Sequence, residues 1–464
     1  MRLVPKTRDA QPIAMEARGI TPQLAKQLTP DAGRAREALR PAANLGISAA
    51  LTRHNSLEGR IPQEEFENIF GTTLQEVTRD LTNTAPGTKE SYLTATEELK
   101  IPQDLQDTIE FAYIPTPPTF FAVAAIPPNV SVYHLRLADV RRVLGGSRCH
   151  RRGWTGRNVR VAMTDSGFAN HPYFVEQGYN IERVTTPTTE HPLLDDSGHG
   201  TGESANTLVM APDCHFIGVK HDDYSALALE TALEQNPQII TNSWGWDIDR
   251  QSKAQIRQSD PNFYNELIDL ENIINDAIDD GIVIIFSGGN GHLAFPACIP
   301  DVLAIGGATV YQDGGIEASS YASSFASQLY PGRQVPDVCG IVGEYSPNSP
   351  LKGHIMLPVP NGSRLEGANM PNSQSRKGWG IFSGTSAAAP QTAGLVALLL
   401  QINPDLSPAQ IKAIISDTAT DVTKGTSGNG DDAQVGYDKA TGAGFINAFQ
   451  ACLRTELLDS PVEQ

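Results

Sequence analysis

The residues VRVAMTDSG at positions 159–167 decide the fold class of this 464-residue chain. The run from Val159 to Met163 is typical of a strand buried on both faces, and such strands belong to parallel sheets covered by helices. Further buried strands are predicted at 216–219, 239–241 and 282–286, with helices at 226–233 and 267–278 between them. This alternation predicts an α/β fold, a three-layer sandwich with a mainly parallel central sheet.

The rest of the chain is divided around this core, which we place at residues 151–455. Residues 1–115 form an N-terminal helical or partly ordered region, with two short amphipathic helices predicted between 61 and 81. Residues 116–150 start with a proline-rich connector and predict a hairpin over 120–135, then a helix over 137–144 that Gly145-Gly146 ends. The whole N-terminal part is therefore expected to be α+β, and residues 456–464 to be a C-terminal tail.

Charge and cysteine content limit the partners and the compartment. The net charge of −18, from 35 basic and 53 acidic residues, repels nucleic acid and anionic membranes. The apolar stretch 394–402 is shorter than the roughly 20 residues of a membrane span. Residues 1–9 lack the apolar run of a secretory signal. The five cysteines are odd in number and scattered along the sequence, as expected of reduced thiols, so we predict a cytoplasmic protein. These cysteines are Cys149, Cys214, Cys298, Cys339 and Cys452.

Two segments offer an acid and a base. Asp165 follows the strand 159–163, so its carboxylate is expected at the sheet edge where ligands of α/β folds bind, although Asp-Ser-Gly is also a common turn. His199 lies between two glycines that leave its imidazole uncrowded. A loop histidine is the alternative. A metal site with His191, Asp195 and Asp196 is disfavoured because the spacing matches no zinc pattern, and we predict no metal and no cofactor.

Two more segments offer an oxyanion donor and a nucleophile. Asn290, in the glycine-rich turn 287–291 after a buried strand, can present its amide to a developing oxyanion, or be a plain Asn-Gly turn. Ser386, in SGTSAAAP at 383–390, begins a long apolar helix, where a helix N-cap is the alternative. Three alanines after it leave room for a substrate backbone.

Asp165, His199 and Ser386 follow one another in the order of the subtilisin arrangement, and their four blocks, with that of Asn290, resemble the subtilisin-like family of serine peptidases. The resemblance covers roughly residues 153–450. It implies that these three residues are catalytic and that Asn290 binds the oxyanion. It also implies substrate binding by two segments, the edge Ser243-Trp244-Gly245 and the pocket segment Ser287-Gly288-Gly289. The small pocket lining favours a medium or large uncharged side chain.

The chain departs from the family pattern in three places. Pro336-Asp337-Val338-Cys339-Gly340 replaces the family's usual Ala-Pro-Gly ending. Gly202-Glu203 stands where many relatives carry a second histidine and a small apolar residue. Residues 345–379 are an extra stretch before the nucleophile, which we interpret as a rim, lid or specificity loop. Residues 428–432 are interpreted as a turn and not as a calcium loop.

The expected function is that of a serine endopeptidase acting through an acyl-enzyme on peptide or protein substrates. Residues 119–146 are placed like the inhibitory prodomain of the family, which predicts a zymogen with an intramolecular inhibitor and self-cleavage between about 144 and 153. The alternative outside enzymes is a catalytically silent pseudo-protease that binds peptides or partners. An esterase or a peptide ligase could use the same nucleophile.

Overall fold

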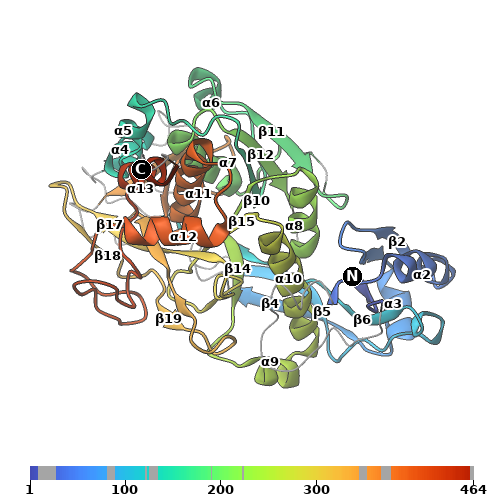
Figure 1. The fold of residues 1–464 in the computed structure, drawn as a ribbon. Coiled ribbons are helices and arrows are strands. Elements are labelled where there is room, and N and C mark those ends of the chain that lie inside the picture. The colour runs from blue at the N-terminus through green and yellow to red at the C-terminus, as the bar shows by residue number, and fades with distance from the viewer. Residues whose placement is uncertain are drawn as a thin grey trace, which may run out of the picture.

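A computed structural model describes residues 1–8, 28–80, 89–120, 123–124, 134–189, 191–221, 224–343, 353–366 and 378–459. An eight-stranded sheet forms its centre, with the strand order β11-β12-β10-β13-β15-β17-β18 and β21 also beside β17 (Figure 1). Every pairing in this sheet is parallel except that of β17 with β18. Its strands are β10 (Arg160–Asp165), β11 (Ile181–Thr185), β12 (His215–Lys220), β13 (Ile239–Asn242), β15 (Val283–Ser287), β17 (Leu303–Val310), β18 (Ile316–Ala318) and β21 (Val338–Ile341).

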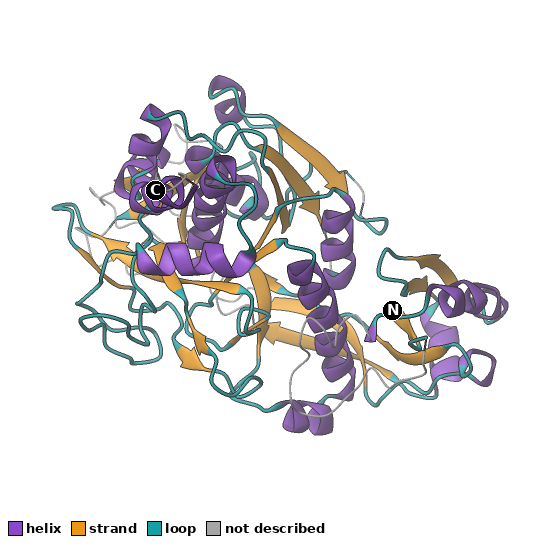
Figure 2. Ribbon diagram, viewed as in Figure 1, coloured by secondary structure: helices purple, strands orange, loops and turns teal. Residues whose placement is uncertain are grey.

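Helices cover both faces of this sheet (Figure 2). Neighbouring strand residues point to opposite faces, so Val161 belongs to one buried cluster and Ala162 to another. The first cluster contains α7 (His199–Met210), α11 (Thr385–Ile402), α12 (Pro408–Asp417) and α13 (Ala448–Asp459); the second contains α8 (Ser225–Glu234) and α10 (Pro261–Asp279). The predicted three-layer α/β sandwich is confirmed.

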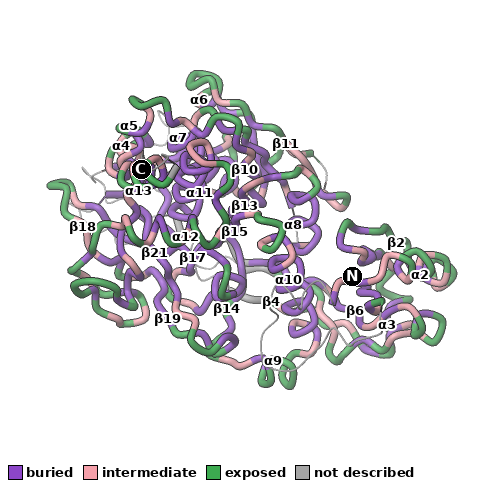
Figure 3. Tube along the Cα trace, viewed as in Figure 1, coloured by how far each residue is buried: buried purple, intermediate pink, exposed green. Residues whose placement is uncertain are grey.

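The core helices follow from local sequence. α12 begins with a capping box, in which the Ser407 and Gln410 side chains bond to each other's backbone N–H groups. α11 is apolar and long enough to span a membrane, but 89% of its apolar window is buried inside the protein, as expected of a core helix. Figure 3 shows α7 and α11 buried along their length. The smaller elements of the core are α6 (Pro172–Glu176), β14 (Trp244–Asp247), α9 (Lys253–Ser259), β16 (Ala294–Phe295), β19 (Phe325–Ala326) and β20 (Gln334–Val335).

The N-terminal lobe is a small α+β unit. Its four-stranded sheet has the order β2-β3-β1-β6. The predicted helix after residue 61 is confirmed as α3, which ends at Gly71 in the left-handed conformation, but the predicted second helix is wrong because β4 and β5 pair there as an antiparallel hairpin. The elements of the lobe are β1 (Arg2–Pro5), α2 (Ala32–Asn44), β2 (Ser48–Leu51), β3 (Leu57–Arg60), α3 (Gln63–Phe70), β4 (Leu74–Asp80), β5 (Lys89–Ala95), η1 (Gln103–Leu105) and β6 (Ile109–Tyr113).

Arg2 joins the lobe to the α/β core. The expectation of a loosely ordered start is wrong for residues 2–5, which form a buried strand, while residues 9–27 lie outside the described part. The Arg2 guanidinium is fully buried and contacts Glu58 of the lobe at 2.8 Å, Glu230 of α8 at 2.9 Å and Asp269 of α10 at 2.6 Å. Apolar residues of β1 and β6 extend the same interface, which places the lobe against α8 and α10 (Figure 1).

The connection from lobe to core differs from the predicted hairpin. Its described parts, β7 (Thr119–Phe120), β8 (Val123–Ala124) and β9 (His134–Leu135), pair with three strands of the core and not with one another; residues 121–122 and 125–133 lie outside the description. Two of these partners are β22 (His354–Pro358) and β23 (Trp379–Ser383), the described strands of the extra stretch and the segment after it. The order of this second sheet is β8-β23-β22-β9.

Two helices follow the connection. α4 (Leu137–Val143) was predicted, and a second short helix, α5 (Gly146–Arg151), which was not predicted, follows it. Gly145 has φ of 84° and starts this second helix, and Cys149 is fully buried on it. Because both helices pack into the same cluster as α7, α11 and α13, residues 134–151 belong to the α/β core and the predicted boundary near residue 150 is displaced. α13 likewise continues to Asp459, into the predicted tail.

Candidate active site

Parallel strands bring the predicted polar residues to one edge of the central sheet. Asp165 is the last residue of β10, His199 is the first of α7, and Ser386 is the second of α11. All three side chains are almost completely buried. The carboxyl ends of parallel strands and the amino ends of the following helices meet at this edge, which explains the juxtaposition.

Asp165 and His199 form a buried hydrogen-bonded pair. The imidazole Nδ1 lies 2.7 Å from Asp165 Oδ1 and 2.9 Å from Oδ2. The carboxylate also accepts the backbone N–H of Ser166 at 2.7 Å. When Nδ1 of an imidazole is bonded to a carboxylate, Nε2 is the nitrogen that can accept a proton from another group.

Asp195 holds the loop before His199. It accepts the backbone N–H groups of Gly198 at 2.8 Å and Thr201 at 2.9 Å, together with the hydroxyls of Ser166 and Thr201. A carboxylate with four donors of this kind fixes the entry to α7. This occupation of Asp195 does not support the alternative of a metal site around His199.

Burial and charge act in opposite directions on His199. Burial lowers the pKa of His199, whereas the Asp165 charge and hydrogen bond, followed by Glu203 and Asp195, raise it, and the net pKa lies above the ordinary 6.5. The surroundings of the ring therefore favour its protonated imidazolium form. The ring also stacks on Phe382, with centroids 6.3 Å apart and planes 25° apart.

Ser386 is presented by a tight turn between β23 and α11. Its hydroxyl is buried and forms no hydrogen bond with the described part of the chain, while its carbonyl accepts the Ser243 hydroxyl at 3.0 Å. Hydrogen bonds of catalytic groups are often long before substrate binds. Three buried alanines follow the serine, so no bulky side chain of its own helix covers it.

Asn290 is oriented by the residue before Ser386. Its Oδ1 accepts the backbone N–H of Thr385 at 2.9 Å and the Thr385 hydroxyl at 3.1 Å. That hydroxyl accepts the backbone N–H of Gly289 at 3.1 Å. Because the oxygen faces Thr385, the amide nitrogen is directed to the other side, as an oxyanion donor requires. Thr385 carries no catalytic signal in the sequence.

The predicted substrate edge already has a strand paired with it. Trp244 and Gly245 of β14 pair antiparallel with Phe120 and Thr119 of β7. The Trp244 side chain is fully buried, and its Nε1 donates to Thr164 at 2.7 Å, so only the backbone of this residue faces a ligand. Peptides that add a strand to an exposed edge bind through such main-chain bonds.

A strand is also paired on the other side of the nucleophile. Ser383 and Phe382 of β23 pair antiparallel with Val123 and Ala124 of β8. Residues 119–120 and 123–124 thus lie on two edges that flank Ser386, and only two residues separate these pairs in the sequence. Residues 119–120 and 123–124, the described start of the segment predicted to be a prodomain hairpin, therefore lie at the candidate cleft.

The pocket segment is tightly packed. Ser287 is the last residue of β15 and fully buried, and Gly288 donates its backbone N–H to Ile305 at 2.7 Å. At Gly289, φ is 106° and an added Cβ would lie 2.7 Å from Ser323 Oγ, so this turn requires glycine. The role of residues 287–289 in substrate binding stays a prediction.

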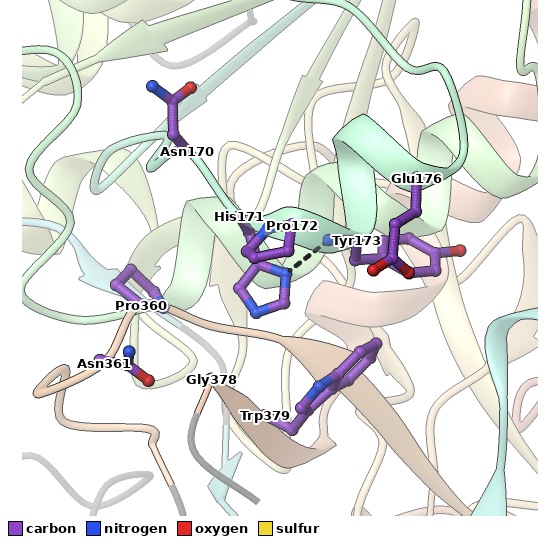
Figure 4. Close-up of a pocket in the computed structure, with 9 residues that line it drawn as sticks. All are labelled: Asn170, His171, Pro172, Tyr173, Glu176, Pro360, Asn361, Gly378 and Trp379. Carbon is purple, nitrogen blue, oxygen red and sulfur yellow. Dashed lines mark hydrogen bonds between the residues drawn. The ribbon is translucent and has the colours of Figure 1, made fainter.

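A cavity of about 310 Å³ opens at the start of β23 (Figure 4). Its wall combines aromatic and acidic groups, with the Trp379 ring 5.5 Å from the rings of His171 and Tyr173. The lining residues are Asn170, His171, Pro172, Tyr173, Glu176, Pro360, Asn361, Gly378 and Trp379. Sequence inspection missed this site because its walls come from residues 170–176 and from the middle and the end of the extra stretch, which are far apart in the sequence.

Known proteins share the arrangement of the core. The sequence pattern of the Subtilase family matches residues 156–438, more than half of the chain. The chain belongs to the subtilase family. It is 26% identical over 312 residues to alkaline elastase YaB of Bacillus sp. (strain YaB), covering 65% of this chain and 66% of that protein. It is 25% identical over 296 residues to subtilisin NAT of Bacillus subtilis subsp. natto, covering 58% and 63%.

This subtilase spans just under two thirds of the length of those relatives. Among solved structures it resembles fervidolysin from Fervidobacterium pennivorans, described as a keratinolytic enzyme related to subtilisin, with a TM-score of 0.56 and 18% identity. That match covers 90% of this chain and 59% of the other. At this identity the likeness concerns the fold, and it confirms the subtilisin-like architecture that the motifs predicted.

Proposed function

We propose that this subtilase is a serine endopeptidase whose own residues 119–124 hold the cleft in an inhibited state. The hydrogen bond between Asp165 and His199 is the observation that carries the catalytic part of the proposal. The relatives with which the chain shares its family support the same reaction class. The proposed substrates are peptides or proteins.

In the proposed reaction, His199 Nε2 takes the proton of the Ser386 hydroxyl as Ser386 Oγ attacks a peptide carbonyl. The oxyanion formed on that carbonyl receives hydrogen bonds from the Asn290 amide and the Ser386 backbone N–H. His199 then returns the proton to the leaving amine, which breaks the peptide bond and leaves an acyl-enzyme. Water repeats the sequence and releases the acid, while Asp165 offsets the imidazolium charge.

The inhibited state rests on the two strand pairs that flank Ser386. β7 pairs with β14 on one side of Ser386 and β8 pairs with β23 on the other, so each described pair has the antiparallel main-chain bonding of a peptide added to an exposed edge. The N-terminal lobe, held through Arg2, keeps this segment next to the cleft. A segment of Phe, Ala and Val also agrees with the predicted preference for uncharged side chains.

We place self-cleavage between Phe120 and Val123, in place of the interval 144–153 expected from the sequence. Residues 146–151 form the helix α5, and Cys149 within it is fully buried. A peptidase cleft binds extended chain, so a helix anchored in the core through Cys149 is a poor substrate. The five cysteines are free thiols, all buried, which supports the prediction of a cytoplasmic location.

Intact-mass spectrometry of the wild type beside Ser386→Ala tests this function. We expect the wild type to give a cut between residues 120 and 123 and to react with a fluorophosphonate once the lobe is removed. Ser386→Ala should stay intact and unlabelled. Wild-type protein that neither cuts itself, hydrolyses peptides nor reacts with the probe would favour the silent pseudo-protease.

A further inference from the structure

A second carboxylate faces the imidazole of His199. Glu203 lies four residues after His199 on α7, one helical turn along the same face. Its side chain is 1% exposed, and its Oε1 lies 4.0 Å from His199 Nε2. The imidazole ring thus lies between Asp165 on its Nδ1 side and Glu203 on its Nε2 side, the side that takes the proton of Ser386.

Side chains of two helices hold Glu203 in this position. Its Oε2 accepts the Asn206 amide at 2.8 Å, and Asn206 accepts the Gln391 amide at 3.3 Å. Gln391 lies on α11 and bonds to both backbone groups of Ile341 on β21. The Glu203 carboxylate is therefore tied to the helix that begins with Ser386.

The other carboxylate oxygen has no such support. Within the described chain, Glu203 Oε1 is buried and has no hydrogen-bond donor. A buried carboxylate oxygen without a donor is costly unless a proton or a cation satisfies it. When protonated, His199 is the cation nearest to this oxygen among the ion pairs of the described chain.

Gly202, the residue before Glu203, leaves room for the Phe382 ring beside His199. An added Cβ at Gly202 would lie 2.5 Å from the ring of Phe382, which stacks on His199. Any side chain at this position would displace that ring. Gly202 and Glu203 thus belong to one local structure around His199.

We propose that Glu203 is a positioning residue for His199, whose carboxylate attracts the protonated ring from the Nε2 side and so sets the pH at which His199 becomes a base. The inference rests on the proposed function. The imidazolium that forms when Ser386 gives up its proton then has a carboxylate on each side. The same attraction keeps a proton on the pair in the resting enzyme, so activity begins at a higher pH.

The charges around the pair agree with this assignment. Burial raises the pKa of Glu203 to about 7, while His199 and the Asn206 hydrogen bond lower it and Asp165 raises it. The other carboxylate that acts on His199 is Asp195. The packed segments α11 and β23 carry no ionisable side chain, and β22 carries His354, whose ring lies edge-on to His134. His199 and Glu203 therefore titrate as a pair.

An NMR titration of the His199 ring in the Ser386→Ala protein tests the inference without any need for activity. Glu203→Gln keeps the size and the oxygen that accepts from Asn206 but removes the charge. We expect the His199 pKa to fall by about 1 unit. Glu203→Asp should keep most of the parent value, and Glu182→Gln, a similar charge change at a half-exposed site beside His215, should keep all of it.

The active enzyme gives the second readout. With Ser386 present, the acid limb of kcat/KM against pH should move to lower pH in Glu203→Gln, by about the same 1 unit. An unchanged His199 pKa, or a loss of rate that is equal at every pH, would overturn the inference. Wild-type protein without hydrolysis or probe labelling would instead refute the proposed function, and the NMR result would still decide the role of Glu203.

Discussion

The backbone of Phe120 pairs antiparallel with that of Trp244, so the chain's own segment lies on the edge strand of its candidate cleft. Three residues later Val123 pairs with Ser383, close to the nucleophile. The cleft of this subtilase is thus lined on both sides by the connection that leads out of the N-terminal lobe. Under the proposed function, another peptide can bind there only after the lobe has left.

Arg2→Met should detach the lobe. The substitution leaves Glu58, Glu230 and Asp269 buried without their cation, and removal of one partner from a buried ion pair typically costs about 3–5 kcal/mol. We expect faster hydrogen exchange in β1 and β6 of the Ser386→Ala protein. Arg36→Met, an exposed change on α2, is the control. Equal exchange in both variants would show that the apolar contacts suffice to hold the lobe.

The attachment of the lobe should weaken as the pH rises. Burial raises the pKa of Glu58 to about 7, against 4.5 for the free residue, although Arg2 acts to lower it. A raised carboxyl pKa contributes stability that is complete below pH 4.5 and is lost as the pH rises to about 7. Hydrogen exchange of β1 at a series of pH values, corrected for intrinsic rates, should show this change. Glu58→Gln should remove most of it, and a dependence that persists would locate the titration elsewhere.

Asn290→Ala should lower kcat and leave KM nearly unchanged. The side chain is oriented by Thr385 towards the position of an oxyanion, and loss of one such donor typically costs about 3 kcal/mol, or roughly 100-fold in rate. Thr385→Val should lose less, because the backbone N–H still fixes Asn290. Steady-state kinetics on one peptide substrate give both constants. A higher KM with an unchanged kcat would assign Asn290 to ground-state binding instead.

Trp379→Ala should lower kcat/KM for long peptide substrates and leave it unchanged for short ones. We consider a peptide that pairs with β23 in the same register as β8. Its residue opposite Phe382 is followed, three residues later, by the one opposite Trp379, beside the 310 Å³ cavity. Loss of this aromatic wall should lower kcat/KM by about 1 kcal/mol, roughly fivefold, for peptides that extend that far. Peptides that end shortly after the scissile bond are the internal control. Tyr437→Ala, at an exposed aromatic residue, should affect neither.

The sequence was sufficient for the core because its signals are local. The apolar strand before Asp165 depends on a few neighbouring residues, and it is found in the structure as β10. The pairing of Asp165 with His199 also followed from the chain order of the motifs. The orientation of Asn290 required the contact with Thr385, which lies 95 residues away.

Features that depend on distant partners were missed or mispredicted. The stripe of Leu74 and Val77 has a helical spacing, yet the segment is a strand because residues 89–95 pair with it. The predicted hairpin at 120–135 failed for the converse reason, since β7 and β8 find partners more than 120 residues away. The charge of Glu203 is visible in the sequence, but its distance to His199 Nε2 is not.

In the proposed enzyme, the ion pairs of Arg2 delay the release of the lobe after self-cleavage. Breaking the chain between Phe120 and Val123 removes no contact of Arg2 with Glu230 or Asp269, so the severed lobe remains bound at first. Departure of the lobe, and not bond scission, then starts the period in which foreign peptides are cut. The lag between the two events is set by how long the Arg2 guanidinium stays bound to Glu230 and Asp269 of the core.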